Sequence, residues 1–298
     1  MKKVLVTGSN GFIGSHVAEW LKEKEYYVIG LGRNKDSKTP VDEYVCCDLA
    51  SSKAIEILSQ LGGKGLDAVV HLAADMRHEP DTVQVVVANC SGTQKLLEMC
   101  EANSIATFVQ LSSLPVIGKP IQHPITEEHS VDPPTVYHVT KRTQELLANY
   151  AYKKFGVRTV SFRISAPVGI GMNMKTIFPV FVNKALKNEN LVLSGAGTRK
   201  QTYIHVDDIS QAIEKALISN AQGVYNLGSH NLLSNYELAK ICVETLKSDS
   251  QILFSGTEDS MDDYVWDVSL EKIQQDTGYV PKVSIESAIH ELAEYLSK

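Results

Sequence analysis

The chain has 298 residues, of which 43 % are hydrophobic and 21 % charged, a composition that suits one large globular domain or two of ordinary size. A net charge of −6 without any basic stripe excludes a nucleic-acid groove, and no apolar run approaches the ~20 residues that span a bilayer. The first residues show no signal-peptide pattern. The five cysteines have no metal-ligand spacing, so we expect reduced thiols, a cytoplasmic location and no metal.

Strand-like apolar runs alternate with helical patterns from the start of the chain. The expected strands are 3–7, 27–31, 43–47, 68–72, 107–112 and 158–164, and the expected helices are 11–24, 52–61, 82–103 and 134–155. This alternation predicts an α/β fold in which a doubly wound, Rossmann-type parallel sheet carries helices on both faces. We assign residues 1–165 to this dinucleotide-binding domain.

The regular alternation of strand-like and helical patterns ends after residue 165. A loop with two glycines precedes a helical pattern at 176–187, a strand at 191–193, a helix at 206–219 and a strand at 223–227. Ser234 and Glu237 then form a capping box that opens a helix at 236–247. We expect residues 166–298 to form a smaller α/β substrate-binding lobe over the carboxyl edge of the sheet, with a possible return of the chain to the main sheet.

Residues 7–14 form a glycine-rich turn between the first strand and the first helix. Glycine accepts positive φ and allows close backbone approach, and Gly8, Gly11 and Gly14 leave the helix N-terminus open to a pyrophosphate. A tight turn that binds nothing is the alternative. Because the glycines follow a strand and precede an amphipathic helix, the dinucleotide interpretation is favoured.

Tyr137 and Lys141 stand four residues apart in a helical pattern, so their side chains lie on one face. The alternative is an exposed tyrosine beside a solvated lysine. As an acid/base, the tyrosine needs a pKa about 3 units below its ordinary ~10, and a positive charge ~4 Å away supplies that free energy. Ser112 and Ser113 end the preceding strand at the ligand edge, where a hydroxyl either binds a substrate oxygen or satisfies backbone groups.

Together these features resemble the extended short-chain dehydrogenase/reductase family, the group of sugar-nucleotide epimerases, dehydratases and reductases. The resemblance covers nearly the whole chain in eight ordered matches. The matching segments are Thr7–Gly14, Asp48-Leu49, His71–Ala74, Asn89–Thr93, the set Ser113/Tyr137/Lys141, Pro167–Gly169, His205–Asp208 and Tyr225–Gly228. It implies an NAD(P)-dependent enzyme that acts as a homodimer on a small molecule.

The resemblance also implies roles for individual residues. Tyr137 would be the acid/base, Lys141 would lower its pKa and bind the nicotinamide ribose, and Ser113 would bind the reacting oxygen. The residues expected to contact the cofactor are Gly8, Asn10, Gly11, Phe12, Ile13, Gly14, Arg33, Asn34, Asp48, Leu49, Leu72, Ala73, Ala74, Asn89, Leu111, Ser112, Tyr137, Lys141, Ser165, Pro167 and Val168. Those expected to contact the substrate are Met76, Ser113, Ala166, Arg199, Lys200 and Gln201.

The end of the second strand departs from the NAD pattern, in which an acidic residue binds the adenosine ribose. Here Gly32 is followed by Arg33, whose guanidinium can bind a 2′-phosphate through two hydrogen bonds. This favours NADP, with NAD held by Asn34 as the second choice.

The substrate side also departs from the family. Ala166 stands where sugar-nucleotide enzymes usually have asparagine, and Gln201 stands where their diphosphate-binding arginine is common, although Arg199 and Lys200 lie just upstream. The acidic stretch 259–264 would repel a diphosphate unless it points away. The leading hypothesis is a sugar-nucleotide 4-epimerase or 4-keto reductase. The alternatives are a reductase of a carbonyl compound without a nucleotide and a catalytically idle NADP sensor.

Overall fold

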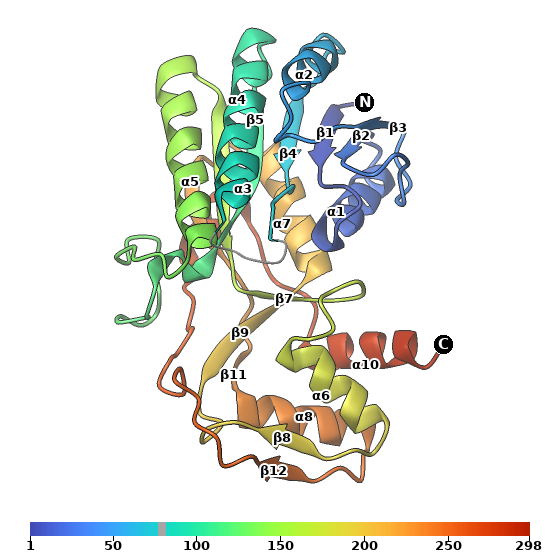
Figure 1. Ribbon diagram of the computed structural model, residues 1–298, viewed down its shortest axis with the longest axis vertical. Helices are drawn as coiled ribbons and strands as arrows, with labels where there is room; N and C mark the ends of the chain where they lie inside the picture. Colours follow the sequence, from blue (N-terminus) through green and yellow to red (C-terminus); the bar gives the residue numbers. More distant parts are fainter. Residues whose placement is uncertain (77–81) are drawn as a thin grey trace.

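The structure, a computed structural model, describes residues 1–76 and 82–298. Its upper part in Figure 1 is built on a seven-stranded parallel sheet with the order β10-β6-β5-β4-β1-β2-β3. The strands are β1 (Lys3–Thr7), β2 (Tyr27–Gly32), β3 (Glu43–Cys46), β4 (Ala68–His71), β5 (Thr107–Ser113), β6 (Arg158–Ile164) and β10 (Gly223–Leu227). The order runs outward in both directions from the β1/β4 pair. The predicted doubly wound α/β fold is therefore confirmed.

Helices cover both faces of this sheet, because its central strands carry apolar side chains on both sides. Three helices cover one face: α1 (Phe12–Glu23), α7 (Val206–Ile218) and α9 (Glu271–Thr277). Three others lie on the opposite face (Figure 1): α2 (Ala54–Gly62), α4 (Gly92–Ala102) and α5 (Val136–Phe155). The six strands expected in the first half match within one residue.

The helix expected at 82–103 is helical from Val83 to Ala102, but it is not an α-helix throughout. It consists of α3 (Val83–Val86), the π-helical turn η1 (Val87–Ser91) and α4. A π-turn shifts the helical phase and occurs frequently at functional sites. Here it directs Asn89 inward, toward the carboxyl end of β4, where its amide is fully buried.

The helix α5 has a defined start and end. Its N-cap Thr135 accepts a hydrogen bond from the His138 backbone N–H, and Gly156 closes the other end in the left-handed conformation at φ 75°. A short 3₁₀ turn, η2 (Leu114–Ile117), follows β5. These elements fix where β5 and α5 present their side chains to the carboxyl edge of the sheet.

The lower lobe in Figure 1 is smaller and has its own core. It contains a three-stranded sheet, a two-stranded sheet and three helices. Its elements are β7 (Ala166–Val168), β9 (Lys200–His205), β11 (Leu232–Ser234), β8 (Leu191–Leu193), β12 (Ile252–Phe254), α6 (Ile177–Leu186), α8 (Asn235–Leu246) and α10 (Ile285–Leu296). The capping box of Ser234 and Glu237 is present at the start of α8, as predicted.

The chain crosses between the two lobes more than once. After β9 it returns to the main sheet, where α7 packs against α1 and β10 pairs with β6 from Gly223 to Leu227. Residue 165 thus marks only the first departure of the chain from the seven-stranded sheet. Among the described residues, no helix is long and apolar enough to cross a membrane.

Candidate active site

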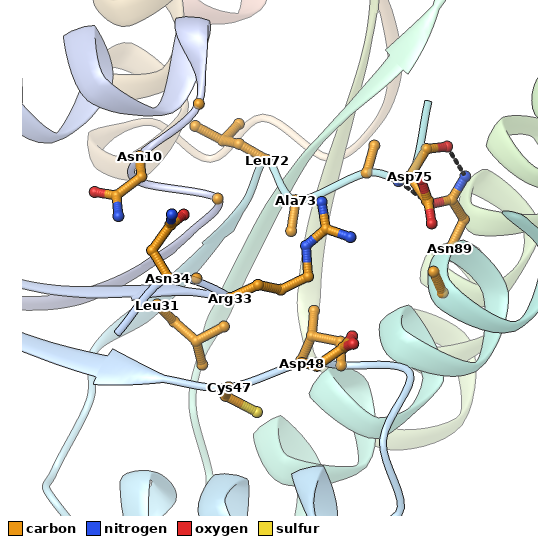
Figure 2. A pocket seen from close by; sticks show the side chains of 16 residues that line it. Asn10, Leu31, Arg33, Asn34, Cys47, Asp48, Leu72, Ala73, Asp75 and Asn89 are labelled. Carbon is orange, nitrogen blue, oxygen red and sulfur yellow. Dashed lines mark hydrogen bonds between the residues drawn. The ribbon is translucent and has the colours of Figure 1, made fainter. Parts of the chain in front are cut away.

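Two cavities open at the carboxyl edge of the main sheet, and they share Gly8, Gly11, Leu72 and Ala74 in their walls. The smaller, of about 260 Å³, lies between the ends of β2, β3 and β4 (Figure 2). The larger, of about 720 Å³, lies between β5, α5 and the small lobe. Every residue expected to contact the cofactor lines one of the two cavities.

At two positions of the glycine turn, Gly8 and Gly14, the neighbouring backbone leaves no room for a side chain. Gly8 has φ 72°, and a Cβ there would come within 2.8 Å of the Ala73 backbone nitrogen. A Cβ on Gly14 would come within 2.0 Å of the Gly8 carbonyl oxygen, so α1 packs directly on the turn. Gly11 caps α1 without a side chain, which leaves the first N–H groups of the helix open to the cavities. This cradle fits a dinucleotide pyrophosphate.

The smaller cavity fits an adenosine group. Asp48 and Leu49, which follow β3, form one wall, and the segment after β4 forms the other. In Figure 2 the Arg33 side chain extends over the cavity toward Ala73. Arg33 is exposed, so a ligand phosphate can reach its guanidinium.

The Asn10 side chain binds the loop after β2, a contact that the sequence did not predict. Its amide donates a hydrogen bond to the Asp36 carbonyl oxygen at 3.0 Å, and its Oδ1 accepts one from the Lys38 backbone N–H at 2.8 Å. Asn10 therefore ties the loop after β2 to the glycine turn. It lines the smaller cavity while its side chain holds this loop.

Asn89 connects the cofactor wall to the helix that carries Tyr137. Its Oδ1 accepts from the Asp75 backbone N–H at 2.7 Å, and its Nδ2 donates to Thr140 Oγ1 at 3.0 Å. Thr140 in turn donates to the Tyr137 carbonyl oxygen at 2.7 Å. Sequence reasoning found Asn89 but not Thr140, whose place between Tyr137 and Lys141 gave no separate signal.

A buried histidine lies beneath this wall. His71 Nδ1 is 2.8 Å from the Thr7 hydroxyl, and His71 Nε2 is 3.0 Å from the Thr93 hydroxyl. The Thr7 oxygen also accepts from two backbone N–H groups after β4, so it donates its own proton to His71. Burial lowers the pKa of His71 to about 3. The ring is therefore neutral at physiological pH and belongs to the scaffold.

Tyr137 and Lys141 both line the larger cavity, as their spacing predicts. The Lys141 ammonium lies 5.8 Å from the centre of the Tyr137 ring and donates to the Leu111 carbonyl oxygen at 2.9 Å. Burial lowers the pKa of Lys141 to about 8. Burial also raises the pKa of Tyr137, so the expected lowering by Lys141 is not present in the protein alone.

The two serines at the end of β5 have different roles. Ser112 donates to Glu145 Oε1 at 2.6 Å, and that buried carboxylate also accepts from Arg163 Nε and Nη2, each at 2.9 Å. The Ser112 hydroxyl therefore belongs to a buried ion-pair network that fixes α5 against β5 and β6. Ser113 is half-buried and lines the larger cavity beside Tyr137, so it is the serine placed to meet a substrate.

The substrate side of the larger cavity lies on the small lobe. Arg199 and Gln201 line the cavity, whereas Lys200, on the alternate face of the strand, does not. The Arg199 Nε is buried and has no hydrogen-bond partner among the described residues. Met76 and Ala166 also line this cavity, as expected.

The acidic stretch 259–264 points away from the cavity. Asp262 Oδ2 accepts from the Ala196 backbone N–H at 2.6 Å, and Asp263 forms an ion pair with Lys119. Neither carboxylate is in the wall of the larger cavity. The predicted repulsion of a diphosphate by this stretch is therefore removed by its orientation.

The burial of the Lys141 ammonium should lower the stability of the folded protein near neutral pH. Its folded pKa of about 8 is below the ordinary 10.5, so below pH 8 the folded state bears a desolvation cost on the order of 3 kcal/mol. That cost disappears as the pH rises from 8 to 10.5, because the unfolded chain then binds more protons. Lys141→Met should raise the free energy of unfolding at pH 7 by about 2–3 kcal/mol and by much less at pH 10.

Urea unfolding of wild type and Lys141→Met at both pH values measures this difference. Taking the difference between the two proteins cancels the other groups that titrate in the same range. An equal difference at pH 7 and pH 10 would show that the Lys141 ammonium is not destabilised by burial.

Comparisons with known proteins identify the family of the chain. Residues 4–228 match the model of the NAD dependent epimerase/dehydratase family. The chain is 26 % identical to a putative UDP-glucose 4-epimerase of Methanocaldococcus jannaschii, with 98 % of each chain covered. It is 28 % identical to a dTDP-glucose 4,6-dehydratase of Streptomyces griseus, covering 95 % of this chain and 90 % of the relative.

A solved structure shows the same fold. The UDP-glucose 4-epimerase of Thermotoga maritima superposes with a TM-score of 0.88 at 22 % identity, covering 99 % of this chain and 98 % of that one. The family match spans the glycine turn, the candidate residues on β5 and α5, and the strand β10. The protein is therefore an enzyme of the extended short-chain dehydrogenase/reductases and belongs to the NAD dependent epimerase/dehydratase family.

Proposed function

We propose that the enzyme transfers hydride at a secondary alcohol or ketone of a sugar nucleotide, as a 4-epimerase or a 4-keto reductase. The observation that carries this proposal is that Ser113, Tyr137 and Lys141 line one cavity, which shares its wall with the dinucleotide cradle. A cofactor with its adenosine in the smaller cavity would thus place its nicotinamide in the larger one, next to the substrate.

The family also includes dehydratases, which must remove water from the sugar in addition to moving hydride. Elimination of water needs an acid and a base beyond the tyrosine, and carboxyl groups commonly fill these roles. Within residues 1–76 and 82–298, no aspartate or glutamate lines the larger cavity. The residues after Ser113 are Leu114 and Pro115, both in its wall. This lining favours epimerisation or reduction over dehydration.

In this mechanism Tyr137 holds the proton that the reacting oxygen gains or loses, and Ser113 donates a hydrogen bond to the same oxygen. A bound nicotinamide supplies the hydride chemistry, and its oxidised form adds positive charge that lowers the Tyr137 pKa. Lys141 binds the ribose of that group and adds its own charge. Glu145 and Arg163 keep α5 aligned with β5, so that the tyrosine and the serine stay on one wall.

The nucleotide part of the proposal is supported by the relatives and by the small lobe. The Thermotoga maritima structure contains UDP-glucose. In this chain Arg199 and Gln201 line the same cavity, and the buried Arg199 Nε has no hydrogen-bond partner in residues 1–76 and 82–298. A buried phosphate requires cationic or several backbone donors, and Arg199 supplies a cation two residues before the position where the family's arginine is common.

The second candidate is a carbonyl substrate without a nucleotide. The observation that favours it is the apolar character of the larger cavity, whose wall includes Phe12, Leu114, Met172, Phe178 and Trp266. Only one arginine faces this cavity among the described residues. An idle NADP sensor is disfavoured, because the candidate serine, tyrosine and lysine are all present and share one wall.

The proposal is tested by incubating the enzyme with UDP-, dTDP-, CDP- and GDP-sugars in the presence of NADP⁺ or NAD⁺, which can accept the hydride from C4. Their 4-keto derivatives are incubated separately with NADPH or NADH, which can donate it. Proton NMR follows inversion at C4, and absorbance at the nicotinamide band follows reduction. Product from a sugar nucleotide supports the proposal. If all four nucleoside diphosphates also fail to inhibit or to raise the melting midpoint, the carbonyl alternative becomes the better one.

We further propose that NADP is the preferred cofactor, although solved relatives such as a dTDP-glucose 4,6-dehydratase of Bacillus anthracis contain NAD. The support is Gly32 and Arg33 at the adenosine cavity. Arg33→Ala should weaken NADPH binding by about 1.5–3 kcal/mol, and NADH binding far less, because only NADPH offers a 2′-phosphate. Nicotinamide fluorescence titrations measure both affinities. Equal wild-type affinities would contradict the NADP assignment.

A homodimer is also proposed. Apolar side chains are exposed on α3 and α5, which lie side by side on one face of the molecule (Figure 1), and they include Val83, Val86, Val139, Leu146 and Tyr150. Such a patch is typical of a protein interface.

The five cysteines are free thiols, which suits a reducing compartment such as the cytoplasm.

A further inference from the structure

Two glycines of β2 form a slot for an aromatic ring of the neighbouring strand. Gly30 pairs in register with Tyr44 of β3, and Gly32 lies two residues further on the same face. A Cβ on Gly30 would lie 3.1 Å from Tyr44 Cδ2, and a Cβ on Gly32 would lie 2.8 Å from the Tyr44 hydroxyl oxygen. The ring therefore covers Gly30, and the hydroxyl occupies the space of a side chain at position 32.

The Tyr44 hydroxyl is held in this place by two hydrogen bonds. It donates to the Asn34 carbonyl oxygen at 3.1 Å and accepts from Asn10 Nδ2 at 3.2 Å. Burial raises the pKa of Tyr44, so the hydroxyl keeps its proton for the bond to Asn34. Asn10 also binds the loop at Asp36 and Lys38. Asn34, the residue after Arg33, is thus connected through the Tyr44 hydroxyl to Asn10 of the glycine turn.

Position 32 is where an NAD-specific dinucleotide fold carries a carboxylate for the ribose hydroxyls. Here such a side chain would force the Tyr44 hydroxyl to move, because a Cβ at position 32 would lie only 2.8 Å from it. The same hydroxyl restrains Asn34, next to the arginine that extends over the cavity (Figure 2). The Tyr44 hydroxyl therefore opposes a carboxylate at residue 32, the contact typical of NAD, and supports Arg33, the residue suited to NADP.

We propose that Tyr44 is a specificity-determining residue: its hydroxyl keeps residue 32 free of a carboxylate and positions the loop that carries Arg33 toward the adenosine 2′-phosphate. This inference rests on the proposed NADP preference. Tyr44 does not line either cavity, so it is a positioning residue that acts through Gly32 and Asn34.

The test uses nucleotide affinity and needs no sugar substrate. NADPH and NADH are titrated by fluorescence into wild type, Tyr44→Phe, Gly32→Asp and the double variant at one fixed ionic strength. In Tyr44→Phe the nearest ring atom, Cζ, is 3.7 Å from a Cβ at position 32, an ordinary contact. Removing the hydroxyl therefore relieves the clash without removing the ring.

Tyr44→Phe removes the hydroxyl's hydrogen bonds to Asn34 and Asn10. We expect it to weaken NADPH binding about two- to tenfold and NADH binding less. Gly32→Asp should weaken both nucleotides at least tenfold. The double variant should bind NADH at least tenfold more tightly than Gly32→Asp does, with no such recovery for NADPH. Tyr27→Phe, on the same sheet but at the other end of β2, is the matched control and should change neither affinity.

Three results overturn the inference: tighter binding of NADH than of NADPH by the wild type, equal NADH affinity of Gly32→Asp with and without Tyr44→Phe, or equal losses for both nucleotides in Tyr44→Phe. If Gly32→Asp does not fold, Gly32→Ala is compared by melting midpoint in the two backgrounds. It should be destabilising only where the Tyr44 hydroxyl is present, and equal shifts contradict the clash. If neither nucleotide binds the wild type, the proposed function itself fails.

Discussion

Tyr137→Phe should lower kcat by about 10²–10⁴-fold while NADPH binds with nearly wild-type affinity. The phenol proton is needed only when the substrate oxygen gains or loses its proton, so its removal affects the chemical step. The ring remains to fill its half-buried place, and the hydrogen bond from the Thr140 hydroxyl to the Tyr137 carbonyl oxygen is unchanged. Steady-state kinetics on the substrate found by the NMR assay measure the loss of kcat.

Tyr152→Phe is the matched control for this prediction, because Tyr152 lies on the same helix and is exposed. It should leave kcat, KM and the melting midpoint unchanged. The result that would remove Tyr137 from the mechanism is a kcat within a few fold of wild type. A loss of nucleotide affinity as large as the loss of kcat would instead indicate that the substitution disturbs the cofactor cradle.

The second large effect concerns the charged end of the substrate. Arg199→Ala should raise KM for a sugar nucleotide by about ten- to a hundredfold, equivalent to about 1.5–3 kcal/mol for a charge-assisted hydrogen bond, with little change in kcat. Uniform binding of a remote phosphate has this kinetic signature, because the same contact is made before and during the reaction. Competitive inhibition by the matching nucleoside diphosphate should weaken by a similar factor.

Lys200→Ala supplies the control, since it removes a neighbouring cation that does not line the cavity. It should leave KM within about twofold of wild type. Equal effects of the two substitutions would mean that general electrostatic attraction, and not a contact in the cavity, binds the substrate. An unchanged KM in Arg199→Ala would argue for a substrate without a diphosphate.

Local sequence patterns predicted the main sheet well, and they also predicted the glycine turn that follows its first strand. The central strands β1, β2 and β4 are short apolar runs with helical patterns between them. The glycine spacing of the turn directly reflects backbone contacts such as that of Gly14 with Gly8. Tyr137 and Lys141 lie on one wall because helical spacing alone decides which residues share a face. In each case the information is contained within a few consecutive residues.

Long-range pairing and burial depth could not be predicted in the same way. The strand at 223–227 lies in the range expected for the small lobe, for which the sequence also allows a return to the main sheet. It pairs with β6, a neighbour that a buried strand does not indicate by itself. The different roles of Ser112 and Ser113 depend on Glu145, more than thirty residues away in the chain. The pKa of Tyr137 depends on how deeply the ring is buried, which its spacing from Lys141 does not determine.

The repeated crossing of the chain between lobes has a consequence for how such an enzyme changes its substrate. A piece that ends at residue 165 would lack β10, leaving the β6 edge unpaired, and would lack α7, leaving uncovered the apolar face shared with α1. An open edge and a bare apolar face favour aggregation. The small lobe therefore cannot be exchanged as a contiguous module, and new specificity must arise by substitution within it, at positions such as 201 in β9 and 199 just before it.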